Sequence, residues 1–308
     1  MNRIFVLISK TFSEIYSLPK FIISLVIMIL FPIIIVAFPS AVDFGQISVS
    51  QASAIIAIAI APYLFLITYG LVFTILIGSS GASLIAEEVS KGTMILLVSK
   101  PISRVKIFLG KYIALCLYGA ILSFIALFIV CWTAVLSYSG NMDHFIGIIP
   151  FMLSMYLYSL FIMFIFVSIT LALSSIFKKS RNASIVVLFL VIFAFLGFTI
   201  IRMFTATYYI SFQLYHFDLG YHIANVFVLF TEVFNSLPPS IGWQLFFSMI
   251  TGVYALTSTT DPDQYIILGG LDKNEYYPPI LSLLLWVAIA TLLLLYGVYK
   301  MKKRELSV

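Results

Sequence analysis

The sequence predicts an all-α integral membrane protein with six transmembrane helices. Of its 308 residues, 62% are hydrophobic and only 9% are charged, and the mean hydropathy is +1.15. Soluble domains carry about 25% charged residues, which help to cover their surface. Because so few charged side chains cannot cover a chain of this length, we expect lipid to cover most of it.

Six apolar stretches are long enough to cross the hydrocarbon core of a bilayer as helices, which takes about 20 residues each. The predicted spans are residues 21–41, 54–79, 112–137, 148–177, 183–204 and 280–299. The fourth stretch is longer than a bilayer requires, so we expect it to tilt or to extend beyond the hydrocarbon.

The basic residues predict the orientation of the chain, because Lys and Arg of short loops are retained on the cytoplasmic side. Fifteen of the 17 lie before the first span, in the second-to-third and fourth-to-fifth connections, or after the sixth span. The other side keeps only Arg202 and Lys273. We therefore expect a multi-pass protein of the cell (inner) membrane with both termini in the cytoplasm. Since the cations are not gathered on one solvated face, we expect no nucleic acid partner.

Residues 1–19 predict an amphipathic helix that lies in the membrane interface. Ile4, Ile8 and Phe12 recur at helical spacing and leave the charged residues on another face. Pro19 favours a break before the first span. The alternative is that these residues form the frayed start of that span.

The segment 205–279 is too apolar for an ordinary outer loop. Within it, residues 222–234 and 241–256 are apolar runs with the length of re-entrant or interfacial helices, separated by Pro238 and Pro239. We expect two short helices on the outer side, between spans five and six. The alternative is a further pair of true spans, which would leave the orientation of the termini unchanged.

One connection between spans, residues 80–111, carries charged and turn-forming residues in a motif-like order. It contains an acidic pair, a Gly-Thr, a Leu-Leu, a Pro-x-Ser-Arg and a Gly-Lys. The candidate functional residues are Glu87, Glu88, Gly92, Thr93, Leu96, Leu97, Pro101, Arg104 and Lys111. Gly92 permits a sharp turn, and Pro101 would end a short helix that begins near Thr93.

This order predicts a rigid elbow whose apolar side chains enter a groove on a soluble partner, while the charged residues fix the register. The alternative is a basic amphipathic loop that lies on the anionic inner leaflet.

The motif order resembles the first cytoplasmic loop of type-2 ABC transporter permeases, the ABC-2 family. The six-span layout, with a long outer connection before the last span, is also similar, so the resemblance covers nearly all of a single permease domain, residues 1–308. The resemblance implies that 80–111 holds a coupling helix, which receives motion from an ABC ATPase subunit. It also implies a dimer with a second copy or a related permease.

The chain lacks the motif needed to hydrolyse ATP, because Gly110-Lys111 is followed by Tyr112 and no glycine precedes it at the phosphate-loop offset. We therefore expect no enzyme activity and no cofactor in this chain, with ATP and Mg²⁺ used by the partner ATPase. The spans hold no ionisable residue other than Arg202, which argues against an ion-driven carrier.

Two further groups of residues are candidate sites. His216, Asp218 and His222 have the spacing of metal ligands, although their aromatic neighbours favour anchoring at the membrane interface. The fourth span carries hydroxyls that suit either helix packing or a polar pathway. They are Ser154, Ser159, Ser168, Thr170, Ser174 and Ser175.

Together these patterns predict the permease subunit of an ATP-driven exporter of a hydrophobic or amphipathic cargo. The alternative is a membrane scaffold or sensor that recruits a cytoplasmic partner through the 80–111 loop.

Overall fold

The computed structural model describes most of the chain. The described residues are 3–38, 44–45, 47–93, 102–238, 240–255 and 271–303. They are almost entirely helical, and their only strand-like pairing is one isolated bridge between Tyr254 and Lys273. The predicted all-α class is therefore confirmed.

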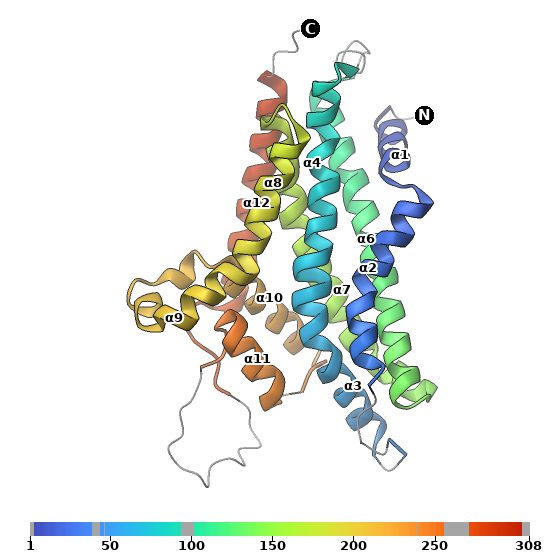
Figure 1. Cartoon of the computed structure of the whole chain (residues 1–308), viewed down its shortest axis with the longest axis vertical. Coiled ribbons are helices and arrows are strands. Elements are labelled where there is room, and N and C mark those ends of the chain that lie inside the picture. The colour runs from blue at the N-terminus through green and yellow to red at the C-terminus, as the bar shows by residue number, and fades with distance from the viewer. Residues whose placement is uncertain are drawn as a thin grey trace.

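Six helical segments are long and apolar enough to cross a membrane, and each overlaps one predicted span. They are α2 (Leu18–Val36), α3 to α4 (Val49–Ser90), α6 (Arg104–Tyr138), α7 (Met142–Ile176), Ser180–Thr205 and α12 (Pro279–Lys303). The helices run side by side, and the start of α1 (Arg3–Ile15) and the end of α12 lie at the same end of the bundle, which we call the terminal end (Figure 1).

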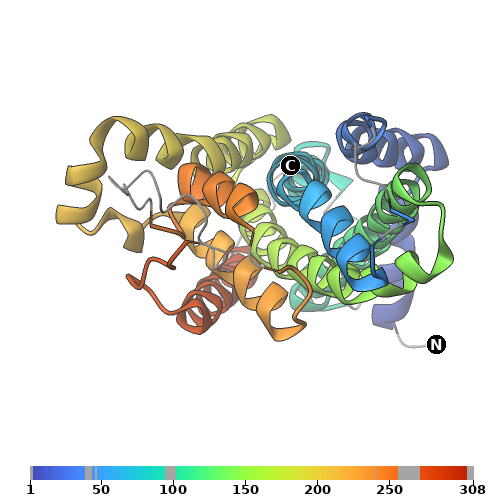
Figure 2. The same ribbon diagram turned by 90° about the horizontal axis from the view of Figure 1, so that it is seen from below.

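The spans differ in how much of their surface other helices cover. The helix α7 is the most buried, because it packs against α12, α4 and α6 at once. By contrast, α2 and α12 lie at the periphery, as the view along the bundle shows (Figure 2). The fourth span, α7, is therefore the central helix of the fold.

The N-terminal helix α1 (Arg3–Ile15) is separate from the first span, as Pro19 predicts. The helix α2 begins at Leu18, with the proline in its first turn, where a missing N–H costs nothing. Leu7 of α1 packs against Gly110 of α6, where a Cβ would lie only 2.7 Å from Leu7 Cδ2. The glycine therefore allows α1 to lie close along α6.

The helix that contains the fifth span continues beyond the span itself, which ends at Thr205, one residue after the predicted limit. It comprises α8 (Ser180–Ile192), the π-helix η2 (Phe193–Gly197) and α9 (Phe198–Ser211). Thr205 has non-helical backbone angles, and beyond it α9 turns away from the bundle (Figure 1). Between Thr205 and Ser211 the sequence contains no glycine or proline that would interrupt the helix.

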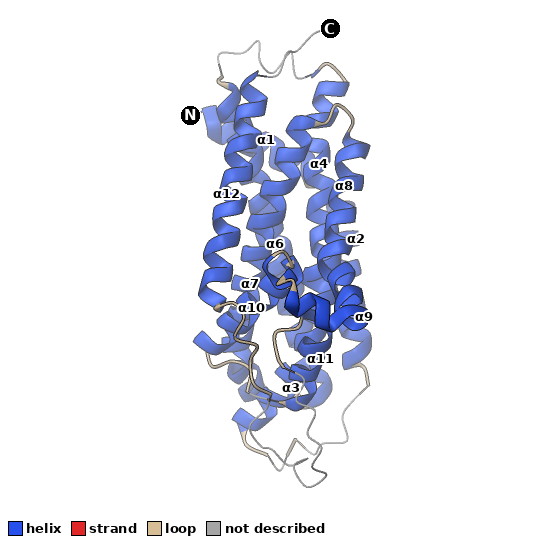
Figure 3. Ribbon diagram, turned by 90° about the vertical axis from the view of Figure 1, so that its left-hand side faces the viewer, coloured by secondary structure: helices blue, strands red, loops and turns tan. Residues whose placement is uncertain are grey.

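Two short helices follow α9, in agreement with the expected pair. They are α10 (Leu219–Val233) and α11 (Ile241–Thr251), and the latter ends at Gly252 with a φ of +74°. Both lie with α9 in the half of the bundle away from the terminal end (Figure 3).

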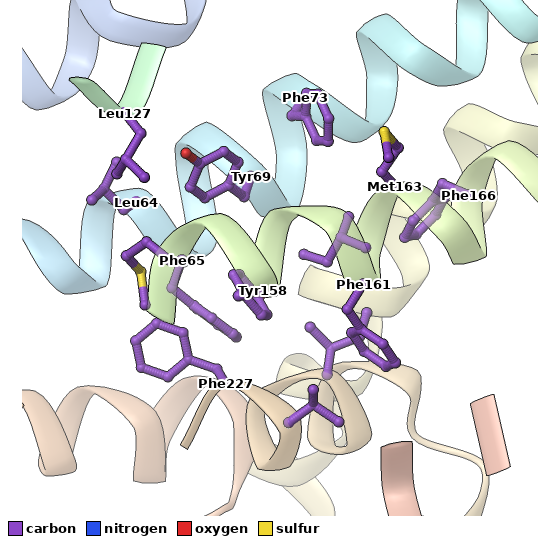
Figure 4. Packing of buried hydrophobic residues seen from close by; sticks show 14 of the residues in the cluster. Leu64, Phe65, Tyr69, Phe73, Leu127, Tyr158, Phe161, Met163, Phe166 and Phe227 are labelled. Carbon is purple, nitrogen blue, oxygen red and sulfur yellow. The ribbon is translucent and has the colours of Figure 1, made fainter. Parts of the chain in front are cut away.

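Aromatic side chains fill the centre where the spans meet these short helices. Phe65 lies 5.6 Å from Tyr158, 5.2 Å from Phe227 and 4.5 Å from Phe247, measured between ring centroids. Figure 4 shows Phe65 of the second span close to Tyr158 of α7 and Phe227 of α10. Phe65 belongs to the π-helix η1 (Leu64–Phe73), which joins α3 (Val49–Tyr63) to α4 (Thr74–Ser90).

Candidate functional site

The predicted elbow begins at the terminal end, where α4 stops at Ser90. Gly92 has a φ of +72°, and its N–H donates to the Val89 carbonyl at 3.2 Å. This left-handed conformation is the usual way to end a helix sharply, and glycine adopts it without strain. Thr93 Oγ1 donates back to the Glu88 carbonyl at 3.3 Å. The turn predicted at Gly92 is therefore present.

The middle of the elbow, residues 94–101, lies outside the described residues, and with it Leu96, Leu97 and Pro101. Their contact with a partner and the short helix expected near Thr93 stay predictions. The chain is described again from Ile102, and Ser103 caps α6 by accepting a hydrogen bond from the Lys106 N–H at 3.4 Å.

Lys111 joins α6 to the last turns of α4. Its ammonium lies 2.7 Å from Glu88 Oε1 and donates to the Leu84 carbonyl at 2.6 Å, and the side chain is only 1% exposed. A buried ammonium without such partners would be very costly. Lys111 and Glu88 therefore hold the two helices that flank the elbow in one register.

Arg104 connects the other side of the elbow to the last span. Its guanidinium donates to the carbonyls of Met301 at 3.4 Å and Lys302 at 3.1 Å, in the last turn of α12. Helix C-termini leave such carbonyls without intrahelical partners, and a cation suits them. Arg104 thus faces α12, whereas Glu87 pairs on the surface with Lys91 at 2.6 Å.

Ser174 of α7 is a third connection to α4, and its specific part in the site was not apparent from the sequence. Its Oγ accepts hydrogen bonds from the N–H groups of Ile85 and Ala86 and donates to the Ala82 carbonyl at 2.8 Å. A serine in an apolar span signals a polar contact but does not name the helix that it reaches.

The hydroxyls of the fourth span as a group support the packing alternative. All six are buried and donate to backbone carbonyls. Ser154 Oγ also lies 2.7 Å from the Ser236 hydroxyl, and Ser159 Oγ lies 3.2 Å from the Ser123 hydroxyl. Ser154, Ser159 and Ser174 therefore join α7 to neighbouring segments.

The three candidate metal ligands in the opposite half serve structural contacts. Asp218 accepts hydrogen bonds from Arg202 and, at 2.8 Å, from the Tyr209 hydroxyl. His222 Nδ1 lies 2.9 Å from the Ser282 hydroxyl, and its Nε2 lies 3.1 Å from the His216 carbonyl oxygen. With both ring nitrogens engaged, His222 has no free ligand atom. The described part of the chain contains no group of three or more potential metal ligands.

Asp218 is the counter-charge of the one ionisable residue noted within the predicted spans. Burial raises the pKa of the Asp218 carboxyl, although the adjacent Arg202 guanidinium and the Tyr221 N–H oppose that shift. Arg202 also donates to the Ile250 carbonyl at the end of α11. The pair therefore ties the bend of α9 to α10 and α11. An arginine in an apolar span signals that a partner exists, but not which one.

Comparison with known proteins agrees with this architecture. The family model described as "ABC-2 family transporter protein" matches residues 5–306, while a comparison with curated proteins gives no match. The match covers all six membrane-capable helices and both sides of the elbow. The chain therefore belongs to the ABC-2 family of transporter proteins, as a multi-pass membrane component of an ABC transporter.

Proposed function

We propose that this chain is the permease subunit of an ATP-driven exporter, and that residues 80–111 couple it to a separate ABC ATPase. The terminal end faces the cytoplasm of the cell (inner) membrane, and a second copy or a related permease completes the pathway. The partner ATPase uses ATP and Mg²⁺, and the cargo is hydrophobic or amphipathic, because the spans present few charges.

The observation that carries this proposal is the set of connections around the elbow. Lys111 ties α6 to α4, Arg104 ties α6 to α12, and Ser174 ties α7 to α4. A force applied to residues 94–101 would therefore be transmitted to α4, α6, α7 and α12 near the terminal end of the bundle. Packed helices shift as bodies when such contacts are kept, which is how closure of the ATPases would open the pathway.

Loss of the ATPase on changing the elbow tests the docking part of this proposal. The tagged protein is purified in mild detergent with native residues or with Leu96→Asp and Leu97→Asp, and co-purifying ATPase activity is measured. Carboxylates in an apolar groove would be desolvated without partners, so we expect the ATPase only with the native loop. The control is Lys178→Asp with Lys179→Asp, which adds acid to another loop at the same end. Recovery of the ATPase with the altered elbow would contradict docking at this site, and no ATPase with any form would favour the scaffold or sensor.

Transport by a Gly92→Val variant tests coupling. A β-branched residue at a φ of +72° costs about 1–3 kcal/mol in strain, which favours another backbone path for the elbow. We expect about a tenfold loss of ATP-dependent transport with expression unchanged. The matched control is Gly140→Val, because Gly140 has a φ of +64° and the same open surroundings at the opposite end. Equal transport by the two variants would count against the elbow as the coupling element.

A further inference from the structure

An open pocket of about 830 Å³ lies at the terminal end, between α1, the start of α2 and the last turns of α4. Its lining includes Leu84 and Glu88, which are the two partners of Lys111, but not Arg104. Its lining has charges of both signs in equal number. The charged residues are Lys10, Glu14, Lys20, Glu87, Glu88 and Lys91. Such a balance suits neither a purely anionic nor a purely cationic ligand.

One lysine of the pocket has no partner within the described part of the chain. Lys10 pairs with Glu14 at 3.4 Å, and Lys91 pairs with Glu87 at 2.6 Å. Lys20 lies in no ion pair and no hydrogen bond among the described residues. It is therefore the cation that remains available to a ligand.

One carboxylate of the pocket is only half used. Glu88 Oε1 contacts Lys111, but Glu88 Oε2 is buried and has no hydrogen-bond partner among the described residues. A buried carboxylate oxygen without a donor is costly, and the positive charge of a ligand placed against the exposed part of the Glu88 side chain, which is 22% exposed, would reduce that cost. The pocket thus offers one site for an anionic group and one for a cationic group.

The position of the pocket relates it to the membrane. Ile23 and Ile27 lie one and two turns after Lys20 on the same face of α2, and they are 58% and 46% exposed. An apolar stripe of this kind faces lipid tails, so Lys20 lies at the level where headgroups begin. Ser79, Ser80 and Ser83 of α4 supply further polar surface across from it.

We propose that this pocket binds the headgroup of a zwitterionic phospholipid from the cytoplasmic leaflet. The phosphate lies beside Lys20, the ammonium lies beside Glu88, and the acyl chains follow the exposed face of α2. This site uses the orientation proposed above but depends on neither transport nor ATP.

Lipid competition tests the site on the purified full-length protein. Phosphatidylethanolamine and phosphatidylglycerol are added in equal amounts, and bound lipids are counted by native mass spectrometry. We expect phosphatidylethanolamine to be retained preferentially, because phosphatidylglycerol has no ammonium group to place beside Glu88. Lys20→Gln removes a charge-assisted hydrogen bond and is expected to weaken that binding about fivefold or more. Lys178→Gln, an exposed lysine outside the pocket, is expected to leave it unchanged.

Two results would overturn the proposal, namely equal retention of both lipids by the native chain, or equal binding by the Lys20→Gln and Lys178→Gln variants. A further arm adds free O-phosphoethanolamine, which has the same charged groups without acyl chains. If O-phosphoethanolamine displaces phosphatidylethanolamine when the two are present at equal concentration, the acyl chains do not contribute to binding, and the assignment to a lipid is overturned. Since no ATPase is present, these results are independent of the coupling experiments.

Discussion

Lys111 and Arg202 are largely buried among apolar helices, and each has a carboxylate partner from another segment. Lys111 contacts Glu88, and Arg202 contacts Asp218. In a low-dielectric interior, removing one member of such a pair leaves an uncompensated charge. At the scale of single residues, the loss of one member of either pair is therefore costly, so each pair restricts how its two segments can shift.

Replacing Arg202 alone is expected to be strongly destabilising. Arg202→Met leaves Asp218 buried and unpaired, and we expect a loss of about 3 kcal/mol in the free energy of unfolding, seen as a lower thermal midpoint in detergent. Adding Asp218→Asn should restore part of the loss, because asparagine still caps α10. The control is Lys273→Met, whose partner Glu232 is half exposed, and it should cost less than about 1 kcal/mol. An equal loss in both single variants would contradict the buried-pair interpretation.

Two π-helical segments, η1 in the second span and η2 in the fifth, contact each other within the bundle. At their contact, a Cβ on Gly70 would lie 2.8 Å from Phe195 Cε1. Segments of this type are rare and widen a helix locally, often at functional sites. At the scale of elements, η1 turns Phe65 and Tyr69 into the aromatic centre while Gly70 admits the fifth span.

Gly70→Ala is expected to push these two segments apart. The added methyl group lacks space against Phe195 and the Phe65 carbonyl oxygen, and overpacking of this kind costs about 1–3 kcal/mol. The thermal midpoint in detergent should fall, and Phe195→Leu should recover part of the loss by removing the ring. The control is Gly242→Ala, where the added Cβ would lie 3.9 Å from Ser240 Oγ, and no loss is expected there. A stable Gly70→Ala variant would show that the two segments are not tightly packed.

The whole molecule has one end with most of its basic residues and an opposite end where α6 turns into α7. The start of α1 and the end of α12 both lie at the first end (Figure 1), as an even number of spans requires. The proposed orientation places this end in the cytoplasm, where Lys and Arg are retained.

Cysteine labelling in whole cells tests that orientation. Cys116 and Cys131 are first replaced by alanine, and a single cysteine is introduced at Asp143 or at Lys179, both of which are exposed. A membrane-impermeant maleimide should label Asp143→Cys in intact cells and Lys179→Cys only after the membrane is opened. The reverse pattern would invert the proposed orientation and exclude docking of a cytoplasmic ATPase on the elbow.

Much of the fold was predictable because a bilayer imposes a length and a polarity that single segments must satisfy. The six spans, the break at Pro19 and the turn at Gly92 each depend on local residues, so local reasoning found them. The predicted fifth span ends at residue 204, next to the bend at Thr205, but the continuation of the helix to Ser211 was missed, because a helix beyond a span is stable or not according to what it packs against. The limit predicted at residue 256 was too late, because Gly252, with a φ of +74°, ends α11 at Thr251.

For the candidate site, the sequence by itself determined which residue types lie on the connection between spans two and three. Only the tertiary structure decided that Lys111 reaches Glu88, that Arg104 reaches α12 and that Ser174 reaches α4. Arg104 and Lys302 are 198 positions apart, and the sequence alone does not indicate which distant residue a side chain will contact. Apolar length is a property of one segment, whereas the partner of a charge depends on how all the helices pack.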